Sequence, residues 1–184
     1  KLAFRRDAHE YRNLLMTEQP NEDYAVTMGR QFFFDVYHYF TLKSLTESSD
    51  ERVAGIAAKA LKEATYHLRR SSEWVKRLGD GTEESHSRMQ DAVDILWRFT
   101  GELITPDDSD RVMAEAGIGP DTDQLAKDWR GMVNEVLTQA TLTPGAEDAW
   151  MYMGGKHGEH TEHLGFILAE MQFLQRAYPD ATTW

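Results

Sequence analysis

The stretch that decides the fold reads Lys59-Ala60-Leu61-Lys62-Glu63-Ala64-Thr65-Tyr66-His67-Leu68-Arg69-Arg70. It lies inside a longer helical pattern, which extends from about Asp50 to Leu78. Small and apolar residues recur there at steps of four and three, the spacing of one face of an α-helix. The residues on this face are Val53, Ala57, Ala60, Ala64, His67, Ser71, Trp74 and Leu78. The pattern predicts a long helix that packs against other helices and places His67 inside a bundle.

His67 stands where a helical bundle could bind a metal ion. Carboxylate-bridged metal sites in such bundles combine two lone Glu residues with two Glu-x-x-His pairs. Here the residue three positions before His67 is Ala64, and Glu63 lies one position too early. The preceding helical pattern, which begins near Glu22, carries a lone carboxylate, Asp35, on its inner face. Asp35 and His67 are therefore ligand-like positions of an incomplete site.

Two interpretations of Asp35 and His67 remain open. They are two ligands of a di-iron centre whose other ligands come from upstream helices, or they form a buried polar pair. We favour the pair, because a complete centre needs about six protein ligands and because a buried carboxylate without a partner is costly. This interpretation predicts no metal in this chain, vestigial ligand positions at Asp35 and His67, and His67 as the first candidate to neutralise Asp35.

The composition narrows the classes of partner. With 184 residues and a hydrophobic content of 41%, the chain is expected to form one domain, residues 1–184, with a substantial core. Its formal net charge of −11 disfavours nucleic acid and anionic membrane surfaces as partners. It has no cysteine and no run of about 18 apolar residues, which argues against thiolate metal sites and a membrane-spanning helix. We therefore expect a cytoplasmic protein.

The remaining patterns are also helical. They predict helices at residues 2–17, after the cap Asn21, after the cap Thr82, after Thr105, after Asp121 or Thr122, and up to Pro179. The helix after Asn21 contains the aromatic residues Phe32, Phe33, Phe34, Tyr37, Tyr39 and Phe40. This is more aromatic surface than one bundle face can bury, so we expect a partner protein to cover part of it. No convincing strand is present, and the predicted fold class is all-α.

A glycine loop precedes the last helix. Gly154 and Gly155 offer backbone N–H groups near a helix start, and Lys156 adds a positive charge. Such groups can hold an anion. The loop is not a Walker motif, because the earlier Gly and the following Ser or Thr are missing. The alternative interpretation is a flexible connection between helices.

Three histidines and two glutamates crowd residues 157–163. The spacing contains no Glu-x-x-His pair, so a dedicated metal site is not expected. The same segment begins the last helix. The inner face of that helix is expected to comprise His160, Leu164, Ile167, Met171, Leu174 and Tyr178.

Several blocks of the sequence together resemble the PaaC-type subunits of bacterial phenylacetyl-CoA epoxidases. The blocks are Glu18-Gln19-Pro20-Asn21, Ala57-Ala58-Lys59-Ala60-Leu61-Lys62-Glu63, Tyr66-His67-Leu68-Arg69, Gly155-Lys156, His160-Thr161-Glu162-His163-Leu164-Gly165 and Leu168-Ala169-Glu170-Met171-Gln172. The resemblance extends along the whole chain. It implies a ferritin-like helical bundle, and it implies that the two leading helices of the family, before Lys1, are absent from this chain.

The resemblance also implies a role in aerobic phenylacetate breakdown. In that family a homologous PaaA-type subunit holds the di-iron centre and epoxidises the aromatic ring of phenylacetyl-CoA. The PaaC-type subunit lacks the iron ligands and binds that partner tightly, as one of several subunits of the complex. A reductase subunit with flavin and an iron–sulfur cluster delivers electrons from NADPH. The implied function is a structural subunit with no catalytic residue and no cofactor of its own.

If the pocket of the partner opens beside the glycine loop, Gly154, Gly155 and Lys156 are candidate contacts for the phosphates of coenzyme A. Two other functions stay open. The first is that the chain is a di-iron oxygenase or oxidase in its own right. The second is that it is a helical acyl-CoA-binding protein. Upstream helices that supply Glu and Glu-x-x-His ligands would favour the di-iron enzyme.

Overall fold

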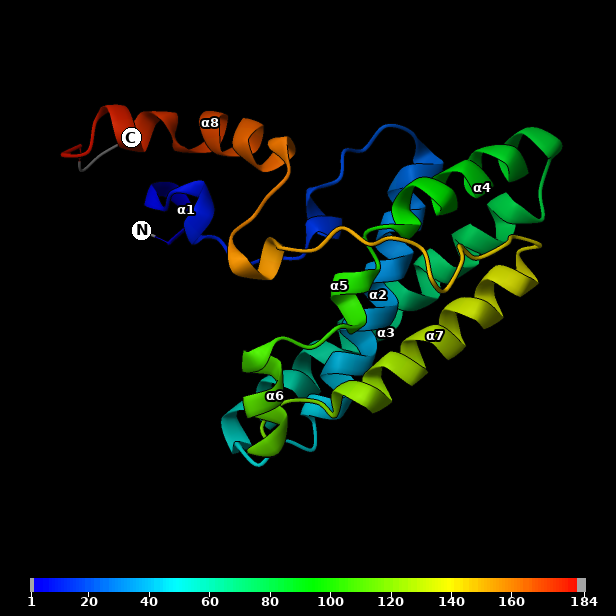
Figure 1. Ribbon diagram of the computed structural model, residues 1–184, viewed down its shortest axis with the longest axis horizontal. Coiled ribbons are helices and arrows are strands. Elements are labelled where there is room, and N and C mark those ends of the chain that lie inside the picture. Colours follow the sequence, from blue (N-terminus) through cyan, green and yellow to red (C-terminus); the bar gives the residue numbers. More distant parts are fainter. Residues whose placement is uncertain (1, 182–184) are drawn as a thin grey trace.

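The computed structural model describes residues 2–181 as helices connected by loops (Figure 1). The helices are α1 (Leu2–Arg5), α2 (Tyr24–Leu45), α3 (Glu51–Gly79), α4 (Glu83–Trp97), α5 (Gly101–Ile104), α6 (Asp108–Glu115), α7 (Thr122–Gln139) and α8 (Glu162–Ala177). Three short 3₁₀ turns are η1 (Ala8–Glu10), η2 (Leu15–Glu18) and η3 (Gly155–His157). No strand occurs between residues 2 and 181, and no helix in that range is long and apolar enough to cross a bilayer. The prediction of an all-α fold is confirmed.

The central helix is α2, and α3, α4 and α7 pack around it (Figure 1). Phe32, Phe33 and Val36 of α2 are completely buried. The ring centroid of Phe33 lies 6.0 Å from those of Trp97 on α4 and Trp129 on α7. The Trp129 indole N–H also donates a 3.0 Å hydrogen bond to the Phe33 carbonyl. A helix that is apolar on most of its circumference needs several neighbours, and the core lies where α2, α4 and α7 meet.

Four further aromatic residues of α2 are partly covered by the chain itself, whereas Tyr24 at the start of the helix stays 45% exposed. Phe34, Tyr37, Tyr39 and Phe40 are partly buried and pack against the same core. The chain therefore buries much of the aromatic surface of this helix, because α3, α4 and α7 pack around it. That a partner protein covers the remaining exposed part stays a prediction.

The central sequence pattern forms α3 with the predicted boundaries. The Asp50 carboxylate caps the helix by accepting hydrogen bonds from the N–H groups of Arg52 and Val53, at 2.8 and 3.2 Å. The helix ends at Gly79. Its buried residues include Ala57, Ala64, Leu68, Ser71 and Val75. Small side chains on this face allow α2 to approach closely.

The N-terminal segment differs from the prediction. Residues 2–17 do not form one helix but are divided among α1, η1 and the start of η2. Between the turns, the Asn13 N–H donates a 3.3 Å hydrogen bond to the carbonyl of Gly155. A segment whose backbone bonds a distant loop cannot also complete a helical ladder.

Two predicted caps are displaced by two residues. Asp23, rather than Asn21, caps α2, and Asn21 instead accepts a hydrogen bond from the guanidinium of Arg30. Asp107, rather than Thr105, caps α6. Both true caps are aspartates in extended backbone conformation, whose carboxylates accept from the N–H three residues later.

α1 and α8 form a separate pair beside the bundle, where the two ends of the described chain lie together (Figure 1). The buried amide of Gln172 donates hydrogen bonds to the carbonyls of Ala3 and Arg6, at 3.0 and 2.9 Å. Arg176 forms a 2.7 Å ion pair with Asp7. The two ends are therefore joined mainly by polar contacts.

α8 buries a different face from the one predicted. Leu164 and Leu168 are buried, whereas Ile167, Leu174 and Tyr178, which were expected inside, are 55%, 49% and 60% exposed. The neighbours of α8 are the short elements α1 and η1, which cover one side of the helix. The prediction of the inner face of this helix was therefore wrong beyond its first turn.

Gly79 marks a close approach between the end of α3 and the end of α7. A Cβ atom at position 79 would lie 2.9 Å from the Cβ of Ala140 and closer still to its carbonyl oxygen. We predict that Gly79→Ala lowers the free energy of unfolding by about 1–3 kcal/mol. For a chain of this size, Tm should fall by about 2–4 °C for each kcal/mol.

Gly131→Ala is the matched control. Position 131 lies on the exposed side of α7, and an added Cβ meets no atom within 4 Å. Removing a helical glycine there should raise the free energy of unfolding by about 0.5–1 kcal/mol. Urea unfolding of both variants checks the pair, and effects of the same sign would contradict the close approach.

Candidate functional site

Asp35, one of the two ligand-like positions, lies on α2 where this helix contacts α3. Its exposed fraction is 2%. Its Oδ2 accepts a 2.8 Å hydrogen bond from the hydroxyl of Ser71 on α3. Its Oδ1 accepts a 2.6 Å hydrogen bond from the side-chain amide of Gln31. Burial raises the pKa of Asp35 above its ordinary value, and the hydrogen bonds from Ser71 and Gln31, with the charges of His67 and His38, offset only part of this rise. Asp35 is thus a polar link between the two helices.

His67 is not the hydrogen-bond partner that the sequence predicted for Asp35. Its side chain is 44% exposed, and Nε2 lies 3.7 Å from a carboxylate oxygen of Glu63. His67 lies at the edge of the packed face of α3, whereas Ser71, one turn later, is completely buried. The prediction is corrected: Ser71 and Gln31 supply the hydrogen bonds to Asp35, and His67 acts on it through charge.

The groups around Asp35 do not fit a di-iron centre. Ser71 and Gln31 already bind the two carboxylate oxygens. Ala64 has no donor atom at the position where a Glu-x-x-His pair would place its glutamate. Within residues 2–181, no three His, Asp or Glu side chains gather in an arrangement that could hold a metal ion. That this chain carries no metal stays a prediction, which metal analysis tests.

The glycine loop already holds an anion, the carboxylate of Glu102 on α5. Glu102 is 1% exposed. Its Oε1 accepts hydrogen bonds from the N–H groups of Gly154 and Gly155, at 2.6 and 2.7 Å, and its Oε2 accepts one from Leu15, at 2.8 Å. Gly154 has a φ of 126°, which other residues rarely adopt. The two glycine N–H groups therefore bind an anion, but the anion belongs to the chain itself.

Lys156 is also paired within the chain. Its ammonium lies 2.8 Å from the carboxylate of Asp110 and 3.1 Å from the carbonyl of Thr105. Burial raises the pKa of Asp110, but the hydrogen bonds from Lys156 and from the Asp107 N–H outweigh it and leave the pKa below its ordinary value. Each group predicted to contact the phosphates of coenzyme A therefore has an internal partner. The geometry does not support that contact.

A second buried carboxylate, Glu18, fixes the start of α8. It accepts hydrogen bonds from the Asn13 amide at 2.7 Å and from the Thr161 N–H and hydroxyl at 2.8 and 2.7 Å. His160 Nδ1 lies 2.6 Å from its Oε1, and Nε2 of the same ring lies 3.1 Å from the carbonyl oxygen of Tyr11. Both ring nitrogens of His160 are thus used in structural contacts.

The environment of Glu18 favours its ionised form. Burial raises its pKa, but the hydrogen bonds from Thr161, Asn13 and His160 outweigh burial and leave the pKa below its ordinary value. A lowered pKa means that this contribution to stability is present at neutral pH and is lost as the pH falls through the lowered value. The sequence does not reveal the roles of Glu18 and Glu102, because glutamate is normally exposed and no local pattern marks these two as buried.

The chain matches proteins of a known family along its length. A family model described as "Phenylacetic acid catabolic protein", PaaA_PaaC, matches residues 1–184. The chain belongs to this family. The C subunit of the 1,2-phenylacetyl-CoA epoxidase of Escherichia coli strain K12 is 48% identical to it over 178 residues, which cover 97% of this chain and 71% of that protein. The resemblance to PaaC-type subunits is confirmed, and the helical structure agrees with the ferritin-like bundle that it implied.

Glu102 offers a direct test of the buried anion site in this family member. In Glu102→Gln the side-chain amide keeps an oxygen for Gly154 and Gly155 but directs N–H groups at the Leu15 N–H. We predict a loss of about 1–3 kcal/mol in the free energy of unfolding, because a buried donor loses its acceptor. Urea unfolding measures the loss, and Glu115→Gln, at an exposed position of α6, is the control that should change little.

The raised pKa of Asp35 predicts a pH-dependent difference between the wild type and Asp35→Asn. The neutral acid is favoured in the fold, so the stability that Asp35 contributes is complete below its unfolded pKa and is lost as the pH rises through its raised folded pKa. The asparagine variant lacks this loss. The stability of Asp35→Asn relative to wild type should therefore improve from pH 4 toward neutral pH. The size of this improvement is about 1.4 kcal/mol for each unit by which the fold raises the pKa of Asp35.

The measurement is urea unfolding of both proteins across that pH range. Asp35→Ala serves as the control, because it leaves the donors of Ser71 and Gln31 without a partner and should be destabilised by about 1–3 kcal/mol. A difference between Asp35→Asn and wild type that does not change with pH would show that Asp35 has no raised pKa.

Proposed function

We propose that this chain is a structural, non-catalytic subunit of a multicomponent epoxidase that acts on the aromatic ring of phenylacetyl-CoA. The observation that carries the proposal is the 48% identity to the C subunit of the Escherichia coli epoxidase, along almost the whole chain. In this proposal the chain binds and supports a homologous, catalytic PaaA-type subunit. The di-iron centre belongs to that partner, and the NADPH-dependent flavin and iron–sulfur chemistry belongs to a reductase subunit. A cytoplasmic location is part of the same proposal.

The contacts of two buried carboxylates, Asp35 and Glu102, support a structural role. Asp35 is used to join α2 to α3, and Glu102 is used to join three backbone segments. A carboxylate whose oxygens are held by fixed internal donors is poorly placed to bind substrate or to move a proton during a reaction. These groups therefore suit a rigid scaffold, which can present a preformed surface to a partner.

The experiment is co-expression of the full-length protein with the PaaA-type subunit of the same organism, followed by purification through a tag on this chain. We expect the two chains to elute together, with iron in proportion to the PaaA-type subunit. Turnover of phenylacetyl-CoA should require both chains and the reductase. The isolated chain, reconstituted with Fe(II) without oxygen, should retain no stoichiometric iron.

Two results would overturn the proposal. Roughly two irons per isolated chain, with the spectrum of a carboxylate-bridged centre, would make the chain a di-iron enzyme. A monomer that ignores the PaaA-type subunit but binds phenylacetyl-CoA would instead indicate a helical acyl-CoA-binding protein.

A further inference from the structure

The outer face of α3 carries positive charge in an otherwise acidic protein. α3 contains seven Lys or Arg residues and three Glu residues, a net of +4, whereas the whole chain has a net charge of −11. Six of these seven Lys and Arg residues are exposed: Arg52, Lys59, Lys62, Arg69, Arg70 and Arg77. We call the exposed side of α3 that bears them the cationic face.

No cation of this face has a carboxylate within ion-pair distance in the described part of the chain, although Arg69 and Arg77 act on Glu73 through charge at longer range. Among the ion pairs of residues 2–181, those on α3 are Lys76 with Glu73, at 2.6 Å, and His67 with Glu63, at 3.7 Å. None of the six cations of the cationic face takes part in such a pair. Because none of them is held in an ion pair, these cations can pair with carboxylates of another molecule.

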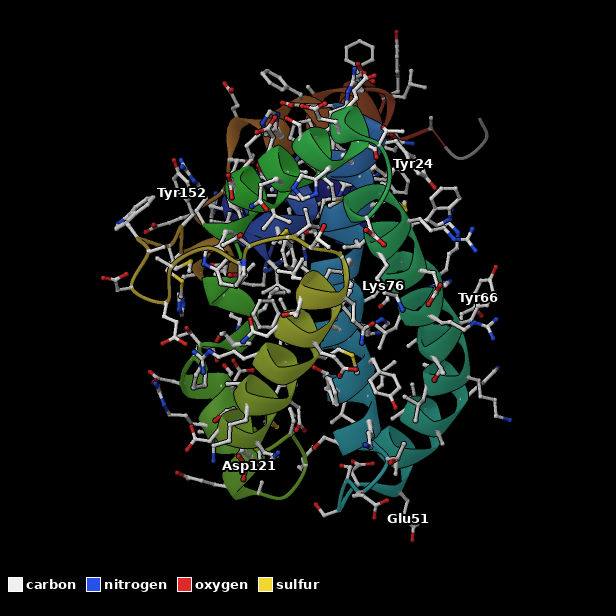
Figure 2. The ribbon with its side chains drawn as sticks, turned by 90° about the vertical axis from the view of Figure 1, so that its right-hand side faces the viewer. Tyr24, Glu51, Tyr66, Lys76, Asp121 and Tyr152 are labelled. Atoms are coloured by element: carbon white, nitrogen blue, oxygen red, sulfur yellow. The ribbon has the colours of Figure 1, made fainter. Side chains whose placement is uncertain are left out.

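The cationic face has a regular geometry and an aromatic component. Lys59, Tyr66, Arg70 and Arg77 follow one another at steps of seven, four and seven, so they lie along one line of the helix. Tyr66 is 54% exposed and points away from the bundle (Figure 2). The guanidinium of Arg69 lies 5.6 Å from the Tyr66 ring centroid, which keeps the ring and the charge together.

A second aromatic group extends this face toward the end of α3. The guanidinium of Arg77 lies 5.6 Å from the ring centroid of Trp74. The ring of Trp74 in turn meets Tyr24 of α2 edge to face, with centroids 5.3 Å apart. Tyr24 is 45% exposed and lies near the same end of α3 in Figure 2. Exposed tyrosine beside arginine is the composition typical of the energetic centre of protein interfaces.

We infer that the cationic face of α3 is the docking surface for an acidic face of the PaaA-type subunit. This inference rests on the proposed function, because it takes the partner to be a subunit of the same complex. Unpaired cations attract clustered carboxylates, and the exposed rings of Tyr66 and Tyr24 bury against apolar groups between them. Nucleic acid and anionic membranes carry the same sign of charge as the rest of this chain, which repels them.

A docking surface of this kind has a kinetic signature. Complementary charges steer the encounter of two proteins, so the association rate is high at low ionic strength and falls as salt screens the charges. Apolar contacts change little with salt. Association through the cationic face should therefore weaken clearly between about 0.05 M and about 0.5 M NaCl.

The experiment compares two double charge reversals in the full-length protein. The test variant is Lys59→Glu with Arg70→Glu, on the cationic face. The matched control is Lys127→Glu with Arg130→Glu, at two exposed positions of α7 outside any ion pair of residues 2–181. Both variants change the net charge equally, and circular dichroism with thermal unfolding establishes that each one folds.

Binding to the immobilised PaaA-type subunit is then measured at low and high salt. We expect the test variant to raise Kd by about 10- to 100-fold at low salt, mainly through a slower association rate, and to lose the salt dependence. The control should bind like the wild type. A folded test variant that binds with unchanged Kd overturns the inference while leaving the proposed function intact.

Two further outcomes of the binding experiment would also overturn the inference. If the wild type does not bind the PaaA-type subunit at all, the proposed function fails and the inference fails with it. If the isolated wild type dimerises and the test variant abolishes the dimer without changing Kd for the PaaA-type subunit, the occupant is a second copy of this chain. That result would overturn the assignment to another subunit.

Discussion

Three backbone N–H groups converge on the carboxylate of Glu102, and the placement of both ends of the chain depends on this interaction. The donors come from Leu15 on η2 and from Gly154 and Gly155 at the glycine loop. These segments have too little regular structure to satisfy their own backbone groups. A buried carboxylate is costly to desolvate, but several hydrogen bonds to the charged form can compensate for that cost. The carboxylate therefore needs the three N–H groups as donors, and the N–H groups need the carboxylate as their acceptor.

Glu18 repeats this arrangement at the start of α8, with Thr161, Asn13 and His160 as its partners. The two carboxylates together hold residues 11–18 against residues 154–161. The bundle of α2, α3, α4 and α7 has a different basis, since its core is apolar and its helices meet through small residues and aromatic rings. The protein thus combines an apolar bundle with terminal segments that are held by buried carboxylates, and the lowered pKa of Glu18 means that acid weakens the contacts of Glu18.

Asp35 is a ligand-like position whose two carboxylate oxygens both take part in structural contacts. Its carboxylate faces a serine hydroxyl and an amide, and Ala64 stands where a metal-binding bundle would place a glutamate. The two hydrogen bonds from Ser71 and Gln31 offset only part of the cost of burying this charge, so burial still raises the pKa of Asp35. In the proposed complex, the surface of α3 rather than the centre of the bundle is the functional part of this chain.

The sequence by itself determined the helical class, the limits of α3 and the burial of Asp35, because helix periodicity and aspartate caps act over a few neighbouring residues. It also indicated that Gly154 and Gly155 suit an anion. Only the tertiary structure decided that this anion is Glu102, 52 residues away from Gly154, and that Ser71 rather than His67 bonds Asp35. Such pairings depend on how two helices or loops are rotated against each other. That rotation is set by the packing of the whole core, and no local pattern records it.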